Sequence, residues 1–264
     1  MKFVDAHVHL SDPEYEPHVG QVIEEAKESS VVALVSNSVN LQTSLQSIKL
    51  AKEHPKLVYA ALGIHPWNVK ELLPNELEQT VDIILNHRKR EEVLAIGEIG
   101  LDYKYVKGEE KEVMAKQYEV FCRMLELSEK LSIPAIIHSR GAALEIMNLL
   151  SSYNLKRVLL HWFSSPIESL PEIVERGYYI TEGPPTVFSS HTQDIIRRVP
   201  LTCLLTETDG PVRYSRPPFK GKMTTPAFIP IVVEAIARVR GEEKMEVAEQ
   251  ICKNFVDFFE VELT

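Results

Sequence analysis

The chain has 264 residues, a length that a single α/β barrel domain commonly uses. Asp and Glu outnumber Lys and Arg by 38 to 29, and the formal net charge of −9 argues against a broad basic surface that binds nucleic acid passively. A phosphodiester substrate still fits this charge if a bound divalent cation supplies positive charge where the phosphate lies. The three cysteines are odd in number and far apart, which excludes a disulfide framework and indicates a reducing compartment.

The sequence shows no pattern typical of membrane spans or export signals. The longest apolar runs have about the length of a strand, well short of the ~20 residues that span a bilayer. A polar motif begins at residue 5, which leaves no room in front of it for a signal peptide. We therefore expect a soluble, cytoplasmic protein without a membrane partner.

Taken in chain order, apolar runs of strand length alternate with segments of helical periodicity. The expected strands are residues 2–10, Val31–Val35, Leu57–Ile64, Val93–Ile96, Pro134–Ile137, Val158–Leu160, Tyr178–Thr181 and Cys203–Leu205. The helices expected after the first seven strands are Pro17–Ser30, Leu41–His54, Leu77–Arg88, Glu112–Leu131, Ala142–Leu150, Ile167–Arg176 and Thr192–Val199. Two further helices are expected at Pro226–Arg240 and Lys244–Phe259.

Eight strand–helix units with almost wholly apolar strands predict a parallel sheet covered by helices. The sequence therefore predicts an α/β fold, a (β/α)8 TIM barrel, with residues 1–264 as a single domain. An open doubly wound sheet is the alternative, but no Gly-x-Gly-x-x-Gly motif opens a helix after the first strand.

Three polar side chains interrupt the first apolar run. Asp5, His7 and His9 alternate with apolar residues, so they share one face of the expected strand. Burying these groups is costly unless something satisfies them, and a divalent cation would do so. Two surface imidazoles on an edge strand are the other interpretation of the His-x-His pattern.

The same kind of residue recurs at the C-terminal ends of the later strands, where barrel enzymes carry their chemistry. These residues are His65, Glu98, His138, His161 and Asp209. Each one alone has a structural explanation, such as a core histidine or a turn aspartate. Together with His7 and His9 they form a nitrogen and oxygen set without thiolates, which suits Zn²⁺, Mn²⁺ or Mg²⁺. Glu207, two residues before Asp209, is expected to hold a neighbouring ligand in place.

Residues 213–222 form a basic segment interleaved with aromatic residues. Its cations are Arg213, Arg216, Lys220 and Lys222, and its aromatic residues are Tyr214 and Phe219. One interpretation is a loop that holds a nucleic-acid backbone and stacks a base; the other is a solvated, proline-rich loop.

Six blocks of the chain, in order, resemble the signature motifs of the TatD family of metal-dependent deoxyribonucleases, which belongs to the amidohydrolase-like barrels. The blocks are Asp5-Ala6-His7-Val8-His9, Gly63-Ile64-His65-Pro66, Gly97-Glu98-Ile99-Gly100-Leu101-Asp102-Tyr103, Pro134–Arg140, His161-Trp162-Phe163-Ser164 and Glu207-Thr208-Asp209-Gly210-Pro211.

The resemblance implies two divalent metal ions. One would be held by His7, His9, Glu98 and Asp209, and the second by His138 and His161, with Glu98 as the bridge. It also implies that His65 contacts the scissile phosphate, with Arg140 or Tyr103 nearby, and that Mg²⁺-dependent hydrolysis of DNA, including single strands, is the activity. In a two-metal mechanism the metals lower the pKa of water, and Asp209 accepts its proton. Glu98, His65 and Asp209 are thus the expected catalytic residues.

The chain departs from the family pattern in three loops. It has Trp162 and Ser165 where the family usually has Cys and Gly, Thr224-Thr225-Pro226 where it usually has Asn-x-Pro, and an unusual segment at residues 181–185. None of these is an expected metal ligand, so metal-assisted hydrolysis stands while the substrate stays open. The alternatives are a hydrolase of small esters, amides or phosphoesters on the same site, and a non-catalytic metal-binding protein.

Overall fold

The computed structural model describes residues 1–87, 92–104, 106 and 110–263. Within these residues the strands are β1 (Phe3–Val8), β2 (Val31–Asn37), β3 (Val58–Leu62), β4 (Val93–Asp102), β5 (Ala135–Arg140), β6 (Val158–Leu160), β7 (Tyr179–Glu182) and β8 (Leu204–Thr206). They form one eight-stranded sheet in sequence order, and each neighbouring pair from β1 to β8 is parallel. Side-chain and backbone contacts bring β8 back to β1: Thr206 Oγ1 donates to Val4 O at 2.7 Å. The predicted (β/α)8 barrel is confirmed.

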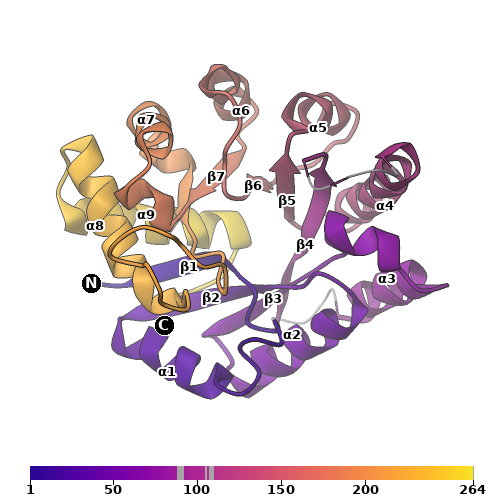
Figure 1. Ribbon diagram of the computed structural model, residues 1–264, viewed down its shortest axis with the longest axis horizontal. Helices are drawn as coiled ribbons and strands as arrows, with labels where there is room; N and C mark the ends of the chain where they lie inside the picture. The colour runs from indigo at the N-terminus through magenta and orange to yellow at the C-terminus, as the bar shows by residue number, and fades with distance from the viewer. Residues whose placement is uncertain (88–91, 105, 107–109, 264) are drawn as a thin grey trace.

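The helices surround the strands (Figure 1). They are α1 (Val19–Glu28), α2 (Leu41–Glu53), α3 (Glu76–His87), α4 (Glu110–Leu131), α5 (Ala143–Leu150), α6 (Leu170–Glu175), α7 (Ser190–Arg198), α8 (Ile229–Arg240) and α9 (Lys244–Phe259), with short 3₁₀ turns between some of them. The predicted helix Leu77–Arg88 corresponds to α3, although Arg88 lies outside the described residues. No helix in the described part of the chain is both long and apolar enough to cross a membrane.

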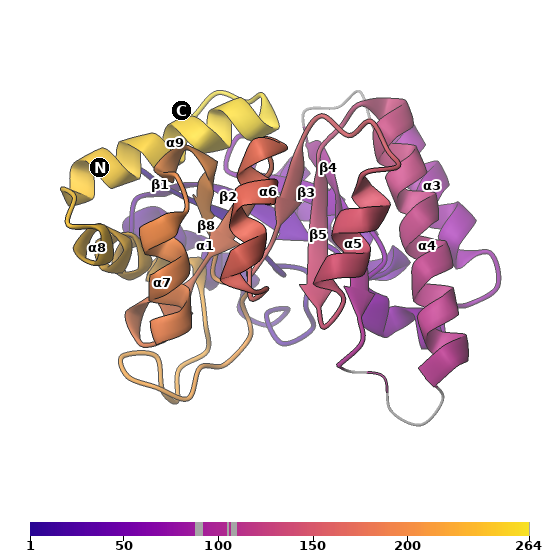
Figure 2. The ribbon, with the colours of Figure 1, turned by 90° about the horizontal axis from the view of Figure 1, so that it is seen from above.

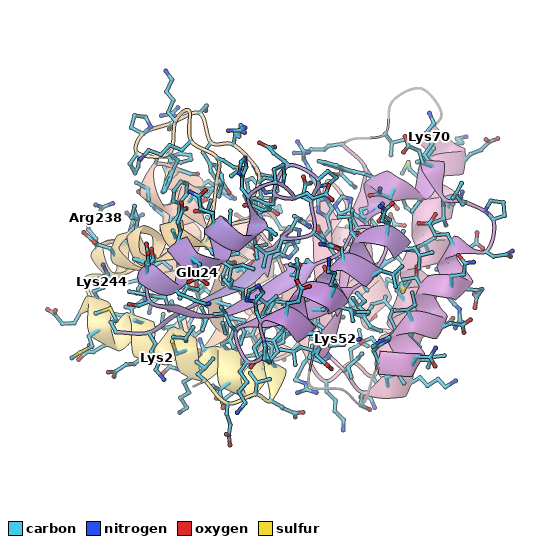
Figure 3. All side chains as sticks on the ribbon, turned by 90° about the horizontal axis from the view of Figure 1, so that it is seen from below. Lys2, Glu24, Lys52, Lys70, Arg238 and Lys244 are labelled. Atoms are coloured by element: carbon cyan, nitrogen blue, oxygen red, sulfur yellow. The ribbon has the colours of Figure 1, made fainter. Side chains whose placement is uncertain are left out.

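The two ends of the barrel differ in what covers them. Helix α9 lies across the end where the strands begin, and its Phe255 and Phe258 are buried in the core. Figure 2 shows the long loop that joins β8 to α8 at the opposite end, toward which the β5 arrow points. Charged side chains such as Lys2, Glu24 and Lys52 point outward around the barrel (Figure 3). The C-terminal ends of the strands are therefore left for loops and polar side chains.

The strands that exceed the apolar pattern most are β4 and β5. β4 continues to Asp102 and β5 to Arg140, and the two pair through Gly100–His138 and Asp102–Arg140. Polar residues remain in these strands because each neighbour in the barrel supplies backbone hydrogen-bond partners. Glu98 and His138 therefore lie within strands and do not follow them, which gives both side chains a fixed direction.

Candidate metal centre

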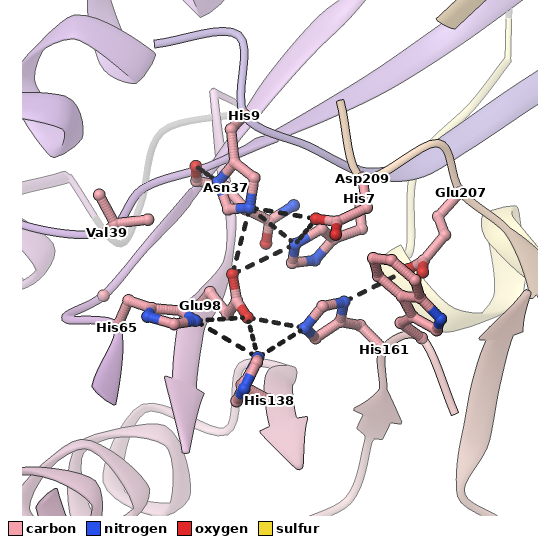
Figure 4. A network of polar contacts seen from close by, with 12 residues as sticks. His7, His9, Asn37, Val39, His65, Glu98, His138, His161, Glu207 and Asp209 are labelled. Atoms are coloured by element: carbon pink, nitrogen blue, oxygen red, sulfur yellow. Dashed lines mark hydrogen bonds and ion pairs between the residues drawn. The ribbon is translucent and has the colours of Figure 1, made fainter. Parts of the chain in front are cut away.

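The side chains expected from the sequence to bind metal meet at the C-terminal end of the barrel (Figure 4). His7 lies in β1, Glu98 in β4 and His138 in β5. His9, His65, His161 and Asp209 come from the segments that follow β1, β3, β6 and β8. Segments spread over more than two hundred residues of chain thus contribute to one cluster.

The Glu98 carboxylate lies at the centre and divides the cluster into two groups. Its Oε2 is 3.3 Å from Nε2 of His7 and 3.3 Å from Nε2 of His9. Its Oε1 faces the other side, 2.8 Å from His138 Nδ1 and 2.6 Å from His161 Nε2. His65 Nε2 is 3.2 Å from the same Oε1. One carboxylate therefore presents a separate oxygen to each group of imidazoles.

Asp209 completes the first group. Its Oδ1 lies 3.5 Å from Nε2 of His7 and 3.3 Å from Nε2 of His9. The backbone holds it there, because Asp209 N donates to His7 O at 3.0 Å and ties the loop after β8 to β1. The side chains of His9, His138 and Asp209 are 15%, 13% and 9% exposed, whereas Glu98 is 1% exposed. The cluster is thus open to solvent on the side that carries these three residues.

Glycines allow the strands to approach closely around Glu98. A Cβ on Gly97 would lie 2.7 Å from Ile136 Cβ, and a Cβ on Gly100 would lie 2.0 Å from His138 O. Gly100 also has a φ of +147°, a conformation that L side chains rarely adopt. The Gly-Glu-Ile-Gly sequence therefore serves to bring the Glu98 carboxylate to the barrel axis between β3 and β5.

Hydrogen bonds on the outer side of the rings indicate which imidazole nitrogens face the centre as lone pairs. His9 Nδ1 lies 2.9 Å from Asn37 O, and His138 Nε2 lies 3.0 Å from Asp102 Oδ2. Each of these outer nitrogens meets an acceptor, so it carries the hydrogen. The inner nitrogen then has a lone pair, which is the state that a metal ligand needs.

His65 has the opposite arrangement. The backbone N–H of Trp67 donates to His65 Nδ1 at 3.1 Å, so Nδ1 is the acceptor and Nε2 carries the hydrogen of the neutral ring. Burial lowers the pKa of His65 to about 4, which keeps the ring neutral. His65 therefore offers a hydrogen-bond donor to the centre, whereas His9 and His138 offer lone pairs.

Electrostatics couples the histidines to the carboxylates. Burial by itself would raise the pKa of Glu98, but the neighbouring histidines, with His161 contributing most, outweigh it and hold this pKa well below its usual range. Burial would lower the pKa of His9, but the neighbouring carboxylates of Asp209 and Glu98 raise it to about 10. Positive charge is thus required between the carboxylates, and protons on the imidazoles supply it when no cation does.

The donor set fits divalent cations. Ligand atoms about 2.1 Å from one cation lie roughly 3.0–3.4 Å apart, and the separations around Glu98 Oε2 fall close to this range. Glu98 Oε2 is buried without a hydrogen-bond donor among the described residues. Three compact groups of candidate ligands occur here: His7 with His161 and Asp209, His7 with His9 and Glu98, and His65 with Glu98 and His138.

Asp102 is a part of the site that the sequence did not single out. Its Oδ2 accepts from Trp67 Nε1 at 2.7 Å and lies 3.0 Å from His138 Nε2. Its backbone N donates to Gln117 Oε1 at 3.0 Å. Asp102 thus joins His138 to the segment that carries His65. A carboxylate at the end of β4, four residues after Glu98, was the available signal.

Asp5 and Glu207 support the cluster from behind. Asp5 accepts from the backbone N of His7 and of Thr208 and from Thr208 Oγ1, so its oxygens join β1 to the loop after β8 and do not face the metal-competent groups. Burial raises the pKa of Asp5 to about 8. Glu207 Oε2 lies 3.5 Å from His161 Nδ1 and accepts from Thr181 Oγ1. It lies where it can orient the His161 ring.

Of the residues expected to contact substrate, His65 lies in the cluster, with Nε2 3.2 Å from Glu98 Oε1, whereas the other four lie outside it. Tyr103 hydrogen-bonds to Glu145 of α5, which together with burial raises the pKa of its hydroxyl. Arg140 is 51% exposed, with Nη1 3.9 Å from Asp102 Oδ2. Arg213 pairs with Glu14 of the loop after β1. Arg216 is exposed on the loop between β8 and α8.

The aromatic residues of segment 213–222 do not form a stacking platform. Phe219 is 1% exposed and packs against Phe228 with ring centroids 4.9 Å apart. Tyr214 is 7% exposed and donates from its hydroxyl to Thr208 O. The interpretation of these rings as base-stacking residues is therefore wrong, because they anchor the loop while its cations face solvent.

Glu182, the last residue of β7, is a buried carboxyl outside the cluster. Neither of its carboxylate oxygens has a hydrogen-bond partner among the residues that the structure describes. Burial, together with the nearby charge of Glu207, raises the pKa of Glu182 well above its usual value. The native protein therefore keeps a proton on Glu182 over a pH range in which the unfolded chain has released it.

Glu182→Gln is expected to raise the free energy of unfolding at neutral and alkaline pH. The contribution of Glu182 to stability falls as the pH rises from its unfolded pKa through its raised native pKa, and glutamine does not titrate. Each unit of the pKa difference corresponds to about 1.4 kcal/mol. Urea unfolding from about pH 5 to about pH 9, with exposed Glu175→Gln as the control, measures it. A gain that does not grow with pH would contradict the prediction.

Comparisons with known proteins identify the family. Residues 4–260 match the model of the TatD related DNase family. The chain is 33% identical to human deoxyribonuclease TATDN3, covering 97% of this chain and 94% of that protein. It is 32% identical to the uncharacterized metal-dependent hydrolase MJ1582 of Methanocaldococcus jannaschii, covering 98% and 97%. The crystal structure of YJJV, a TatD homolog from Escherichia coli, superposes with a TM-score of 0.89 at 27% identity, covering 98% of each chain. The chain belongs to the TatD family of metal-dependent hydrolases that act on ester bonds, the deoxyribonuclease family that its motifs resemble.

Proposed function

We propose that residues 1–264 form one deoxyribonuclease domain that hydrolyses the phosphodiester bonds of single-stranded DNA with two divalent cations, Mg²⁺, Mn²⁺ or Zn²⁺. The observation that carries this proposal is the division of the Glu98 carboxylate, with Oε2 facing His7 and His9 and Oε1 facing His138 and His161. A carboxylate that bridges two cations needs this arrangement.

In this proposal His7, His9, Glu98 Oε2 and Asp209 hold one cation, and Glu98 Oε1, His138 and His161 hold the other. When bound, such cations lower the pKa of water and neutralise charge on the phosphodiester. The exposed sides of His9, His138 and Asp209 give water and substrate access to this position.

The protein groups complete the reaction. The Asp209 carboxylate, on the open side of the cluster, accepts a proton from the attacking water. His65 donates from Nε2 to a phosphate oxygen, because the Trp67 N–H bond to Nδ1 leaves the hydrogen on Nε2. Arg140, Arg213 and Arg216 are exposed cations at or near this end of the barrel and would attract the strand, with Tyr103 at the edge of the site.

We also propose that the protein lies in the cytoplasm. Cys122, Cys203 and Cys252 are all free in the structure, as is usual for proteins of reducing compartments.

Metal removal and reloading test the proposed function. Protein stripped with a chelator should lose hydrolysis of a single-stranded oligonucleotide, and added Mg²⁺, Mn²⁺ or Zn²⁺ should restore it. Elemental analysis of the reloaded protein should find two cations per chain. Hydrolysis that persists in the metal-free protein would contradict the proposal. Hydrolysis of bis(4-nitrophenyl) phosphate without any cleavage of DNA would favour a small phosphoester as the substrate.

A further inference from the structure

A groove opens beside His9, and no step of the proposed reaction uses it. It has a volume of about 590 Å³ and is lined by the loop after β1, by the N-terminal half of α2 and by Asn68. Small-molecule sites commonly enclose about 300–1,000 Å³, so one nucleoside fits within it. Because His9 belongs to the cluster, an occupant of this groove lies directly beside the position proposed for the scissile phosphate.

The wall formed by α2 carries unpaired side-chain amides. Gln42 and Gln46 are four residues apart on one face of the helix, and Asn68 lines the same groove. The side chains of these three residues make no hydrogen bond to any other described residue. Each amide offers both a donor and an acceptor, the combination that pairs with the edge of a nucleobase.

Further features of the lining suit a planar, neutral group. Leu45 lies on the same wall and is 52% exposed, which provides apolar surface for a ring. Asn37, next to His9, has a buried Oδ1 without a donor among the described residues. The groove thus combines apolar contact with amide groups that have free hydrogen-bonding capacity.

The charges in the groove disfavour a second phosphate. Asp12 and Glu16 contribute two carboxylates, and Lys49 contributes an ammonium group. Lys49 Nζ also lies 3.9 Å from Glu53 Oε1, which partly neutralises it. A neutral occupant is therefore favoured over an anionic one.

We propose that this groove binds the nucleoside that is attached to the scissile phosphate, and that Gln42 and Gln46 hydrogen-bond its base. This inference rests on the proposed function and adds to it a preference for nucleotide esters over phosphodiesters without a nucleoside. Gln42 and Gln46 are specificity-determining residues in this proposal.

The test compares two substrates with the same leaving group, 4-nitrophenyl thymidine 5′-phosphate and bis(4-nitrophenyl) phosphate. In the double variant Gln42→Ala/Gln46→Ala, the ratio of kcat/KM for the first substrate to kcat/KM for the second should fall about tenfold, mainly through KM. Gln79→Ala, an exposed glutamine on α3 that does not line the groove, is the matched control and should keep the wild-type ratio. Both mutated side chains lie on the helix surface, and alanine favours the helix, so the fold is retained.

A double variant whose ratio stays within twofold of the wild type, while the wild type cleaves both esters, overturns the nucleoside site and leaves the proposed function standing. Metal-loaded wild-type protein that cleaves neither ester and no DNA overturns the proposed function itself.

Discussion

Glu98→Gln should lower kcat/KM for phosphodiester hydrolysis by at least about 1,000-fold, a loss of roughly 4 kcal/mol of transition-state stabilisation. Glutamine has one carbonyl oxygen and no charge, so it cannot present an oxygen to both His7 and His161 or neutralise the buried imidazoles. The number of bound cations should fall below two per chain. Steady-state kinetics and elemental analysis of the purified variant measure both effects.

Glu119→Gln is the matched control for this variant, because Glu119 is exposed on the outer helix α4 and should keep wild-type activity and metal content. Circular dichroism should show that Glu98→Gln retains the barrel, since the substitution preserves side-chain volume. A Glu98→Gln protein that binds two cations and cleaves DNA at the wild-type rate would remove the basis of the assignment.

Asp102→Asn should lower metal affinity and kcat/KM by about 10- to 100-fold, the usual effect of losing a carboxylate behind a metal-bound histidine. Asp102 Oδ2 takes hydrogen bonds from both Trp67 Nε1 and His138 Nε2, and an amide binds such donors more weakly than a carboxylate. The change should also alter the fluorescence of Trp67, whose indole N–H is bonded to this oxygen. Mn²⁺ titration calorimetry, kinetics and fluorescence measure the three effects.

Asp82→Asn is the matched control, because it makes the same substitution at an exposed aspartate on α3. It should leave Mn²⁺ affinity, kcat/KM and Trp67 fluorescence unchanged. A purely structural role of Asp102 would lower the free energy of unfolding without weakening Mn²⁺ binding in the folded protein. Unchanged Mn²⁺ affinity in the folded Asp102→Asn variant would therefore exclude the positioning role.

Apolar periodicity was a reliable guide to the barrel because it reflects burial on both faces of each strand. All of the predicted strands occur in the described structure in the predicted order, and the errors lie at their ends. The pattern ended the fourth strand at Ile96, whereas β4 continues through Glu98 to Asp102. The polar residues after Ile96 indicate the end of the strand. Backbone pairing with β5 nevertheless continues the strand, because it does not depend on the type of side chain.

Sequence alone determined the fold and the candidate ligands, since histidines and carboxylates at the C-terminal ends of parallel strands must share one end of a barrel. Only the tertiary structure decided how each side chain is turned. The partner of His9 Nδ1 lies 28 residues away, at Asn37 O, and that of His138 Nε2 lies 36 residues away, at Asp102. Such contacts between distant segments determine which nitrogen carries the hydrogen, and no local pattern in the sequence encodes them. For the same reason, the sequence could not predict the burial of Tyr214 and Phe219 or the groove beside His9. Both depend on how the loops pack against each other.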